Sequence, residues 1–438
     1  MPDKKQTATA IVHRLSEAGY QAYFVGGCVR DMVMNIPPKD YDIATDAAPD
    51  KVSKLFLDVI PVGIKFGVLL VMEEGNQHEV ATFRSDHRYE DGRHPTEVRY
   101  SKSSEEDVQR RDFTVNGLLY DPLEDRVLDF VGGREDISKK IIRTIGDAET
   151  RFEEDRLRML RAVRFAARVG FSIDPKTFAA IRSLAPKIHS VSMERIRDEI
   201  LKILTEGQAR RGFELLDESG LLHEILPEVE RMKGVEQPPQ FHPEGDVWIH
   251  TRMMLEGMNA PTATLSLGVL LHDVGKPPTF SVSDRIRFNN HADVGAKMAK
   301  EILQRLRMPS RTIERVYELV LHHLRFKDFP KMRASTQKRF LRMDGFDEHL
   351  ELHRLDCTAS HGDFTHYHLA TQMLDQMPPE VIRPAPLVRG DDLIERGYQP
   401  GPLFKEILNA IEEGQLEGTL KSRSEALQFI ADHFPTKG

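Results

Sequence analysis

Residues 22–45 decide the fold of the first part of the chain, and they read AYFVGGCVRDMVMNIPPKDYDIAT. The apolar residues 22–25 predict a short strand, and Gly26-Gly27 predict a turn that leads into a helix. Backbone N–H groups exposed at such a turn suit a phosphate, and Arg30 can bind the same phosphate with its forked guanidinium. Two glycines alone are equally compatible with a simple tight turn.

Two aspartates, Asp40 and Asp42, follow this turn at a spacing of two. On a strand, residues i and i+2 lie on the same face. Their carboxylates can then hold two Mg²⁺ ions about 3.5–4 Å apart, as in-line phosphoryl displacement requires. An isolated Asp-x-Asp is usually a solvated turn, so the preceding glycine turn is what favours catalysis. We therefore predict Asp40 and Asp42 as catalytic, magnesium-binding residues.

Length and composition are those of an ordinary globular chain with more than one domain. The chain has 438 residues, of which 40% are hydrophobic and 30% charged. Cores rarely grow beyond ~250–300 residues, so two or three domains are expected. No apolar run approaches the ~20 residues that cross a bilayer, so no membrane partner is expected. Two distant cysteines, Cys28 and Cys357, predict no disulfide framework and suit a reducing cytoplasm.

The formal net charge of −8 by itself disfavours a nucleic-acid partner, because phosphate contacts require Lys and Arg. Arginines nevertheless cluster at Arg110-Arg111 and between Arg151 and Arg168. A basic groove on an acidic body is compatible with both observations.

Strand and helix signals divide the chain into regions. Residues 68–72 and 78–83 flank the turn residues Glu74-Gly75-Asn76 and predict a hairpin. Helical patterns dominate from Glu153 onward, and Gln237–Gln240 is a candidate linker. The predicted domains are a catalytic head, a helical neck, a helical body and a C-terminal helical extension, at residues 1–148, 149–236, 237–375 and 376–438.

Two arginine-rich segments follow the aspartates. Residues 109–117 read QRRDFTVNG and set two arginines beside an acid, which is typical of a salt bridge at a helix start. Residues 154–165 predict one amphipathic helix, with an apolar sector and an adjacent sector of arginines. In such a helix Asp155 lies one turn from Arg158, which alone indicates a surface ion pair worth roughly a few tenths of a kcal/mol.

Residues 22–45 resemble the opening motif of the class II tRNA nucleotidyltransferase and poly(A) polymerase family, and the similarity continues through most of the first 230 residues. The resemblance implies an α/β nucleotidyltransferase head with a mixed sheet and helices, followed by an all-α neck and an HD-type helical body. It also implies that Gly27 and Arg30 contact the nucleotide and that Asp40 and Asp42 bind Mg²⁺. Glu79 is a candidate third carboxylate or a charge at a strand edge.

The family resemblance extends to residues 109–117. It makes Arg111 a nucleotide-contacting residue and lets Asp112 and Asn116 shape the sugar site. Gly117 stands where the family often has alanine, a change that touches no expected ligand group.

The resemblance also assigns Asp155 and Arg158 to reading the incoming base, and lets Arg161 and Arg164 hold the triphosphate. The chemistry supports the first assignment, because a carboxylate accepts hydrogen bonds and a guanidinium only donates them. Cytosine and adenine present an exocyclic amine beside a ring-nitrogen acceptor. Guanine and uracil present a carbonyl and an N–H there, so the same pair would reject them.

Two further segments resemble parts of the family. Residues 86–95 resemble a flexible loop thought to help the site change from C to A, with Arg93-His94-Pro95 where the family often has Arg-Arg-Pro. The complete loop argues against an enzyme that adds only CC. Residues 191–199 resemble a segment that braces the neck helices rather than touching substrate.

Residues 270–276 read LLHDVGK and resemble the signature of HD-domain phosphohydrolases. Neutral imidazoles and carboxylates suit a second divalent metal of unknown identity. One predicted site combines His250, His272, Asp273 and Asp356, and another combines His291 with His322 or His323. The alternative is a helical body that contacts the tRNA elbow and keeps its histidines for structural reasons.

The resemblance as a whole implies template-independent addition or repair of the 3′-terminal CCA of tRNA, with CTP, ATP and the tRNA 3′ end as partners. A narrower enzyme that adds only A or only CC, or a poly(A) polymerase, is the first alternative. A metal-dependent HD phosphohydrolase with an RNA-binding head is the second, and the intact Asp40/Asp42 pair argues against it. The sequence does not determine the oligomeric state.

Overall fold

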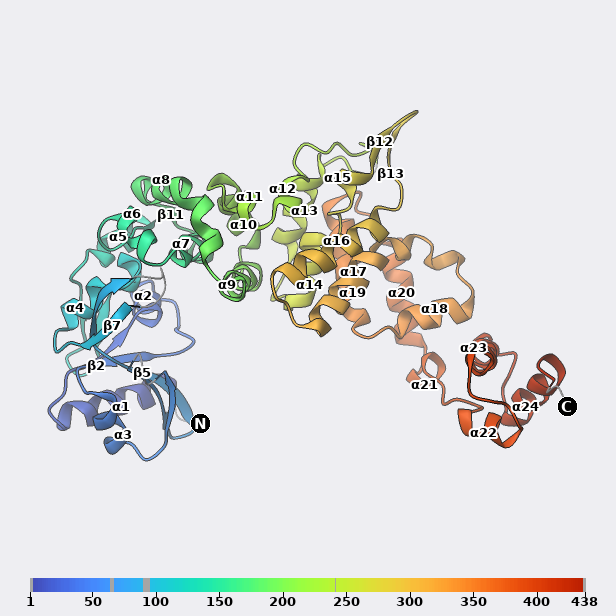
Figure 1. Ribbon diagram of the computed structural model, residues 1–438, viewed down its shortest axis with the longest axis horizontal. Coiled ribbons are helices and arrows are strands. Elements are labelled where there is room, and N and C mark those ends of the chain that lie inside the picture. Colours follow the sequence, from blue (N-terminus) through green and yellow to red (C-terminus); the bar gives the residue numbers. More distant parts are fainter. Residues whose placement is uncertain (1–2, 64–66, 90–94, 241, 436–438) are drawn as a thin grey trace. The chain divides into compact units, whose positions relative to one another are not determined.

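The computed structural model describes residues 3–63, 67–89, 95–240 and 242–435. The chain divides into two compact units (Figure 1). Unit 1 comprises Met1–Glu230 with Arg305–Met308, and unit 2 comprises Arg231–Gln304 with Pro309–Gly438. The predicted architecture, an α/β head followed by helical regions, is confirmed.

A mixed sheet forms the centre of the head, and its described strands are arranged in the order β3-β4-β5-β2-β1-β8-β9. These strands are β1 (Ala22–Val25), β2 (Asp42–Thr45), β3 (Val59–Gly63), β4 (Val68–Glu73), β5 (Asn76–Thr82), β8 (Leu119–Asp121) and β9 (Arg126–Leu128). β2 and β5 pair in parallel, and the other neighbours are antiparallel. A core that includes Val25, Ala44, Phe83 and Leu119 fixes the sheet against its surroundings.

The predicted strand at residues 22–25, the glycine turn and the hairpin at residues 68–83 are all confirmed. Gly26 adopts a φ of 75°, where residues with a Cβ are strained, and helix α2 (Gly27–Val33) begins directly after it. The expectation that both aspartates lie on a strand is wrong. β2 begins at Asp42, so Asp40 lies in the irregular segment before it.

Helix α1 (Lys4–Glu17) packs against the sheet through an apolar stripe at Ala8, Ile11, Val12 and Leu15. Its first turn lies beside the segment that leads into β2, since the Lys4 ammonium binds the Lys39 carbonyl at 2.9 Å. A second described hairpin in the head pairs β6 (Arg84–Tyr89) with β7 (Pro95–Tyr100).

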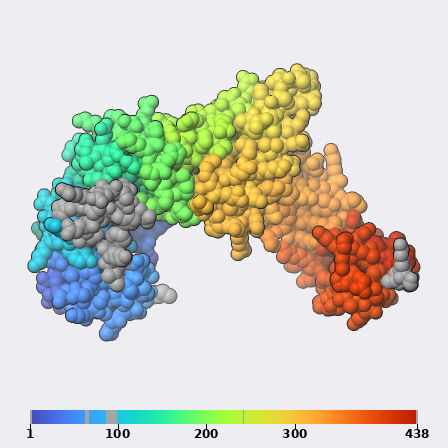
Figure 2. All heavy atoms as spheres, viewed as in Figure 1, coloured from blue at the N-terminus to red at the C-terminus, as the bar shows by residue number. Residues whose placement is uncertain are grey.

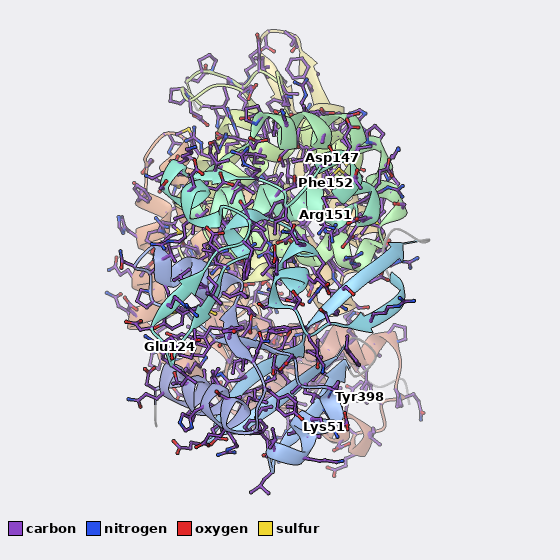
Figure 3. The ribbon with its side chains drawn as sticks, turned by 90° about the vertical axis from the view of Figure 1, so that its left-hand side faces the viewer. Lys51, Glu124, Asp147, Arg151, Phe152 and Tyr398 are labelled. Atoms are coloured by element: carbon purple, nitrogen blue, oxygen red, sulfur yellow. The ribbon has the colours of Figure 1, made fainter. Side chains whose placement is uncertain are left out.

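The neck contains short helices, namely α6 (Ala148–Glu154), α7 (Leu157–Val169), α8 (Pro175–Leu184), α9 (Met193–Thr205), α10 (Ala209–Glu218), α11 (Leu221–Ile225) and α12 (Pro227–Glu230). Asp147 caps α6 by accepting the N–H of Thr150 at 2.9 Å, and Figure 3 labels Asp147, Arg151 and Phe152 on this part of the chain. The Arg151 guanidinium joins α6 to the head, because it donates to the Arg111 carbonyl at 2.6 Å.

The prediction of one continuous helix over residues 154–165 is wrong. Asp155 has extended backbone angles, φ −148° and ψ 101°, and separates α6 from α7. Its carboxylate accepts the N–H of Leu157 at 3.2 Å, so the side chain replaces a helical backbone partner at the start of α7. The apolar pattern continues across the break and therefore could not reveal it.

Unit 2 is a helical body with one projecting hairpin, β12 (Phe280–Val282) and β13 (Ile286–Phe288). Its main helices are α13 (Val247–Gly257), α14 (Ala263–Leu271), α15 (Lys276–Thr279), α16 (His291–Arg305), α17 (Ser310–His322), α18 (Ala334–Leu341), α19 (Phe346–Ala359) and α20 (Thr365–Gln376). The proposed linker residue Gln237 is instead buried in this unit, where it accepts a hydrogen bond from Lys276 at 2.6 Å.

The C-terminal helices α21 (Pro379–Ile382), α22 (Gly390–Glu395), α23 (Pro402–Glu417) and α24 (Arg423–His433) follow. α22–α24 share a core of their own around Leu393, Ile407, Ile411 and Ile430, and they form a compact group of atoms at the red end of the chain in Figure 2. Within the described parts of the chain, no helix is both long and apolar enough to cross a bilayer.

Candidate functional site

A cavity of about 630 Å³ in unit 1 brings together nearly all of the residues predicted for nucleotide chemistry. The predicted residues that line it come from the glycine turn, the acidic segment, the end of α4 (Ser104–Gln109) and the start of α7. They are Gly27, Arg30, Asp40, Asp42, Arg111, Asp155, Arg158 and Arg161. Their assembly depends on the tertiary fold, because they come from segments far apart in the sequence.

The glycine turn forms one wall of this cavity, and two arginine guanidinium groups lie close to its backbone. A Cβ added at Gly26 would lie 3.5 Å from Nη1 of Arg111, and one added at Gly27 would lie 3.6 Å from Nη2 of Arg30. Arginines therefore approach the bare backbone at the start of α2. Arginine side chains beside a glycine turn make this wall suitable for phosphate oxygens.

Asp42 carries the electrostatic signature of a cation site. Loss of hydration is the largest cause that raises the pKa of Asp42, the carboxylates of Glu79 and Asp40 add to it and Arg111 opposes them, so that the pKa is about 6. The Asp42 side chain is nevertheless reached by solvent in the cavity. Oxygen ligands of this kind fit Mg²⁺, because a divalent cation relieves the repulsion among the acids.

Asp40 lies at the open side of the site. Its side chain is 71% exposed, and its carboxylate is 2.6 Å from the Lys4 ammonium. Glu79 lies on β5 directly before Val80, which pairs with Ile43 of β2. The structure therefore brings the candidate third carboxylate close enough to influence Asp42.

Three of the predicted phosphate-binding arginines are held by ion pairs with neighbouring acids. Arg30 is buried and donates to the Asp31 carboxylate at 2.6 Å and to the Asn116 side-chain oxygen at 2.8 Å. Two further pairs complete the set, Arg111 with Asp107 at 2.9 Å and Arg161 with Asp112 at 2.6 Å. Asp112 and Asn116, which were expected to shape the sugar site, thus contact Arg161 and Arg30.

Arg164 is the one predicted nucleotide-binding residue that the structure does not bring to the cavity. It is 6% exposed, and it donates to the Glu199 carboxylate at 2.6 Å and to that of Glu206 at 3.3 Å. Its guanidinium also lies over the ring of Phe165 at 4.2 Å. These contacts neutralise Arg164 inside the neck, which leaves the adjacent Arg161 and Arg168 to face the cavity.

The base-reading candidates Asp155 and Arg158 both line the cavity, and they do not form the i,i+3 ion pair that was the alternative interpretation of their spacing. Arg158 donates to the Glu154 carboxylate at 2.7 Å and to the Arg151 carbonyl at 2.9 Å. Asp155 instead accepts from Arg195 of α9 at 2.8 Å. Because the helix is broken at Asp155, the two side chains are held apart by different partners.

Arg195 is a cavity residue that the sequence did not reveal. Residues 191–199 were expected to brace neck helices, and Arg195 does so while also lining the cavity. Its partner lies forty positions away, so no local pattern could have connected them. The predicted loop at residues 86–95 is described only in part. β6 and β7 pair up to Tyr89 and Pro95, and Arg93 and His94 lie outside the described residues.

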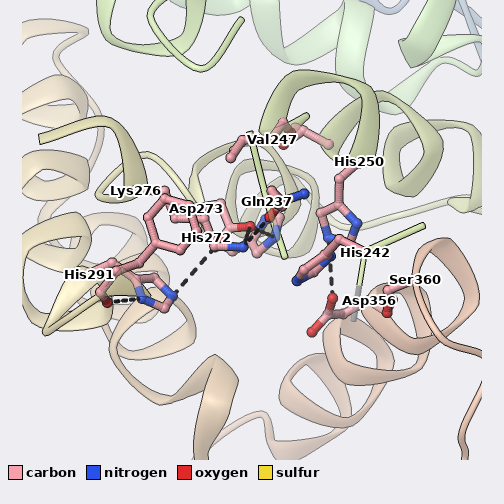
Figure 4. Close-up of polar contacts among 12 residues, drawn as sticks. Gln237, His242, Val247, His250, His272, Asp273, Lys276, His291, Asp356 and Ser360 are labelled. Carbon is pink, nitrogen blue, oxygen red and sulfur yellow. Dashed lines mark hydrogen bonds and ion pairs between the residues drawn. The ribbon is translucent and has the colours of Figure 1, made fainter. Parts of the chain in front are cut away.

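Unit 2 contains a second cluster of predicted site residues (Figure 4). Ligand atoms of His250, His272 and Asp273 lie within 4.8 Å of one another, and so do those of Asp273, His291 and His323. Asp273 therefore joins the two predicted sites into one. The Asp356 carboxylate lies 3.2 Å from Nε2 of His250.

The histidine rings of this cluster are oriented for metal binding. Nδ1 of His272, His291 and His323 lies 2.8, 2.8 and 2.7 Å from the carbonyls of residues 269, 288 and 320. A carbonyl only accepts, so each Nδ1 carries the proton and each Nε2 presents a lone pair. Nε2 of His250 lies 3.2 Å from the Asp356 carboxylate and Nε2 of His272 lies 3.1 Å from the Asp273 carboxylate, but among the described residues these buried nitrogens and Oδ1 of Asp273 complete no hydrogen bond. Such an arrangement fits a divalent metal.

His322, offered as an alternative to His323, is not part of this cluster, because its ring faces His349 at 6.3 Å between centroids. Two residues that the sequence analysis did not propose support His250. Nδ1 of His250 lies 2.6 Å from the Glu244 carboxylate, which His242 also contacts at 2.9 Å. The signal was present in the sequence, since His242 and Glu244 lie shortly before His250.

A cavity of about 550 Å³ opens onto this cluster. Besides the histidines and acids, its lining includes Lys276, Arg287, Phe288 and Lys327. The Lys276 ammonium is 2.7 Å from the Asp273 carboxylate and 5.4 Å from the centre of the Phe288 ring. The cavity thus combines a candidate metal centre with cationic groups that suit a phosphate ester.

Comparison with known families agrees with this division of the chain. Residues 22–143 match the poly A polymerase head domain. Residues 170–233 match the probable RNA and SrmB-binding site of polymerase A, and residues 245–348 match the HD domain.

Similar proteins carry the name CCA-adding enzyme. That of Geobacillus sp. (strain WCH70) is 32% identical over 428 residues, covering 98% of this chain and 96% of that protein. That of Geobacillus thermodenitrificans (strain NG80-2) is 46% identical over 216 residues, so the chain spans about half the length of that relative, 53%. The crystal structure of the Bacillus stearothermophilus enzyme in complex with CTP matches with a TM-score of 0.74 at 29% identity, covering 99% of this chain and 98% of that one. The chain therefore belongs to the family of CCA-adding enzymes.

Proposed function

We propose that this chain adds or repairs the 3′-terminal CCA of tRNA, taking CTP and ATP as substrates without a nucleic-acid template. The observation that carries the proposal is the convergence of a glycine turn, an acidic pair and the Asp155/Arg158 pair on one cavity. The partners are then the tRNA 3′ end and the two nucleotides. Cys28 and Cys357 are both free and buried, which suits a reducing compartment such as the cytoplasm.

Asp40 and Asp42, with Glu79 nearby, are the residues that would hold Mg²⁺. Bound Mg²⁺ supplies Lewis-acid stabilisation of the phosphates and a more acidic attacking hydroxyl. Arg30, Arg111 and Arg161 orient the triphosphate, because each guanidinium is fixed by an ion pair with a neighbouring acid. The 3′-hydroxyl of the tRNA then attacks the α-phosphate, and pyrophosphate leaves from the side of the arginines.

Base selection falls to Asp155 and Arg158. Asp155 can accept from the exocyclic amine of cytosine or adenine, and Arg158 can donate to the neighbouring ring nitrogen. Guanine and uracil carry the opposite donor and acceptor at these positions. They would leave a polar group without a partner inside the cavity, which is costly.

The proposal is tested with tRNA transcripts that end before CCA, after C and after CC, each incubated with one nucleotide at a time. The expected products are C addition to the first two and A addition to the third. An enzyme that adds only A, or only CC, would extend a subset of the transcripts, and a poly(A) polymerase would continue past one A.

Asp42→Ala should abolish incorporation on every transcript, because it removes the acid at the start of β2. Asp50→Ala is the matched control, since Asp50 is an exposed acid of α3 (Pro49–Leu55), and it should leave the rate unchanged. Retained incorporation by a folded Asp42→Ala protein would contradict the proposed role.

A second candidate function, metal-dependent hydrolysis of phosphate esters, is favoured by the cluster around Asp273. Its imidazoles present Nε2 toward a common centre that also receives a buried carboxylate. Hydrolysis of p-nitrophenyl phosphate and bis-p-nitrophenyl phosphate with added Mn²⁺, Co²⁺ or Ni²⁺ tests it. Asp273→Asn should remove the activity, and Asp284→Asn, an exposed change on the hairpin loop, should retain it.

A further inference from the structure

The irregular segment Lys39–Tyr41 poses a structural problem for the acidic site. Asp40 lies in this segment and Asp42 begins β2, so regular strand pairing fixes only the second acid. Metal ligands on irregular backbone need support from surrounding groups to hold their geometry. The support here comes from side chains that bind the carbonyls of residues 39 and 41.

His78 supplies the buried half of that support. It lies on β5, is 2% exposed, and its Nδ1 is 3.2 Å from the Tyr41 carbonyl oxygen. Its other ring nitrogen, Nε2, is 2.8 Å from the hydroxyl of Thr7 on α1. His78 therefore links the peptide between the two aspartates to a strand and a helix of the head.

The tautomer of His78 follows from its partners. A neutral imidazole carries one N–H. The Tyr41 carbonyl can only accept, so Nδ1 holds the proton and donates it. Nε2 is then an acceptor and receives the Thr7 hydroxyl proton. Both ring nitrogens are satisfied in this state, which fixes the ring and with it the Tyr41 carbonyl.

Lys4 supplies the exposed half. Its ammonium donates to the Lys39 carbonyl at 2.9 Å and to the Asp40 carboxylate at 2.6 Å. The Tyr41 ring adds an apolar contact, since its centroid is 5.2 Å from that of Phe24 on β1. The Lys39 carbonyl, the Tyr41 carbonyl and the Tyr41 ring are thus each held by a neighbouring side chain.

We propose that His78 is a positioning residue for the metal-binding aspartates, which acts by holding the Tyr41 carbonyl and so the spacing of Asp40 and Asp42. This inference rests on the proposed function for the identity of the site, but it concerns cation binding itself. It predicts that removal of the Nδ1 donor weakens binding of a divalent cation at Asp42 without removing any ligand.

The test is a Mn²⁺ titration of the full-length protein followed by electron paramagnetic resonance. Mn²⁺ that is no longer bound after Asp42→Ala defines the site and separates it from the cluster in unit 2. His78→Leu should weaken this fraction by about tenfold, the lower end of the range for losing a support of a metal ligand. His78→Asn should restore most of the affinity, because its amide N–H can replace Nδ1.

Val71→Ala is the matched control. Val71 is buried directly opposite His78 in the β4–β5 pairing, so its truncation loosens the same part of the sheet without touching Tyr41. Thermal unfolding should show that Val71→Ala loses about as much stability as His78→Leu. The Mn²⁺ affinity of Val71→Ala should nevertheless equal that of the wild type. Equal weakening by Val71→Ala and His78→Leu, or no rescue by His78→Asn, would overturn the inference.

A readout by binding keeps this proposal distinct from the proposed function. If wild-type protein binds Mn²⁺ at Asp42 but extends no tRNA, the function fails and the role of His78 is still decided by the titration. If His78→Leu binds Mn²⁺ as wild type does, the positioning role fails whatever the tRNA assay shows.

Discussion

At the scale of single residues, Asp42 combines catalytic potential with a cost to the folded state. Its pKa is raised from 3.8 to about 6 chiefly by lost hydration and then by the acids Glu79 and Asp40, so between these two pH values the folded metal-free protein holds a proton that the unfolded chain releases. Active sites often contain groups with pKa values shifted in this way, because binding of a ligand removes the unfavourable interaction.

The first prediction concerns the raised pKa of Asp42. With a chelator present, the contribution of Asp42 should make the folded state more stable as the pH falls from 7 toward 4, because a raised pKa in the folded state favours it at low pH. Allowing for screening by solvent, the gain is about 1 kcal/mol. Urea unfolding of wild type and Asp42→Asn across this range measures it, and identical pH profiles would contradict the cause assigned here.

Asp155 carries the second prediction. Asp155→Ala should relax selection against UTP and GTP by about tenfold to a hundredfold, as expected for loss of one polar contact with the base in a half-buried site. Single-turnover incorporation of each nucleotide measures the effect. Glu153→Ala is the control, because Glu153 pairs with Lys187 and Arg156 and is not part of the cavity lining. Unchanged discrimination in Asp155→Ala would remove Asp155 from base reading.

At the scale of elements, the break between α6 and α7 turns a surface position into a cavity position. In a continuous helix Asp155 would pair with Arg158, whereas the break lets it reach Arg195 of α9. The first turns of two different helices thus fix the orientation of one carboxylate. The orientation of the Asp155 carboxylate in the cavity consequently depends on how the neck helices pack.

The third prediction tests that dependence. Arg195→Met should reduce discrimination against UTP by about tenfold while the maximal rate with CTP changes less, because Asp155 stays present but loses its partner. Arg197→Met is the control, since Arg197 binds Asp198 and the Arg307 carbonyl and does not line the cavity. The same loss of selectivity in both variants would indicate general loosening of α9.

At the scale of the whole molecule, each of the two candidate sites is built within a single unit. The cavity around Asp42 is lined by residues of unit 1, and the cavity around Asp273 is lined by residues of unit 2. Their donor sets also differ, with carboxylates in the first and imidazoles plus carboxylates in the second. Hard oxygen ligands suit Mg²⁺, and imidazole suits a transition metal.

The fourth prediction follows from this separation. Asp273→Asn should leave C and A addition within about twofold of wild type, and Asp42→Ala should leave any phosphate-ester hydrolysis equally unaffected, as expected for independent sites that share no residue. The two assays on both variants and the wild type measure this. Loss of both activities in either variant would show that the sites are coupled.

The fold of the head could be predicted because its signals are local. The strand at residues 22–25, the turn at Gly26 and the hairpin at residues 68–83 each depend on neighbouring residues. Sequence motifs specify residue types, so Asp40, Asp42 and Arg111 could be named as site residues from the sequence. Their geometry could not be predicted in this way. Arg164 and His322 were included because their spacing fits, although packing turns them elsewhere.

By itself, the sequence determined which chemical groups are available and which local turns and strands present them, since glycine turns, apolar alternation and acid pairs act over a few residues. The tertiary structure alone decided where Asp155 points, that Arg195 and His78 support the site, and that Asp273 joins two histidine sets. Partners such as Arg195 and Asp155 lie far apart along the chain. Only the burial that drives folding brings them together and excludes the water that would otherwise satisfy them.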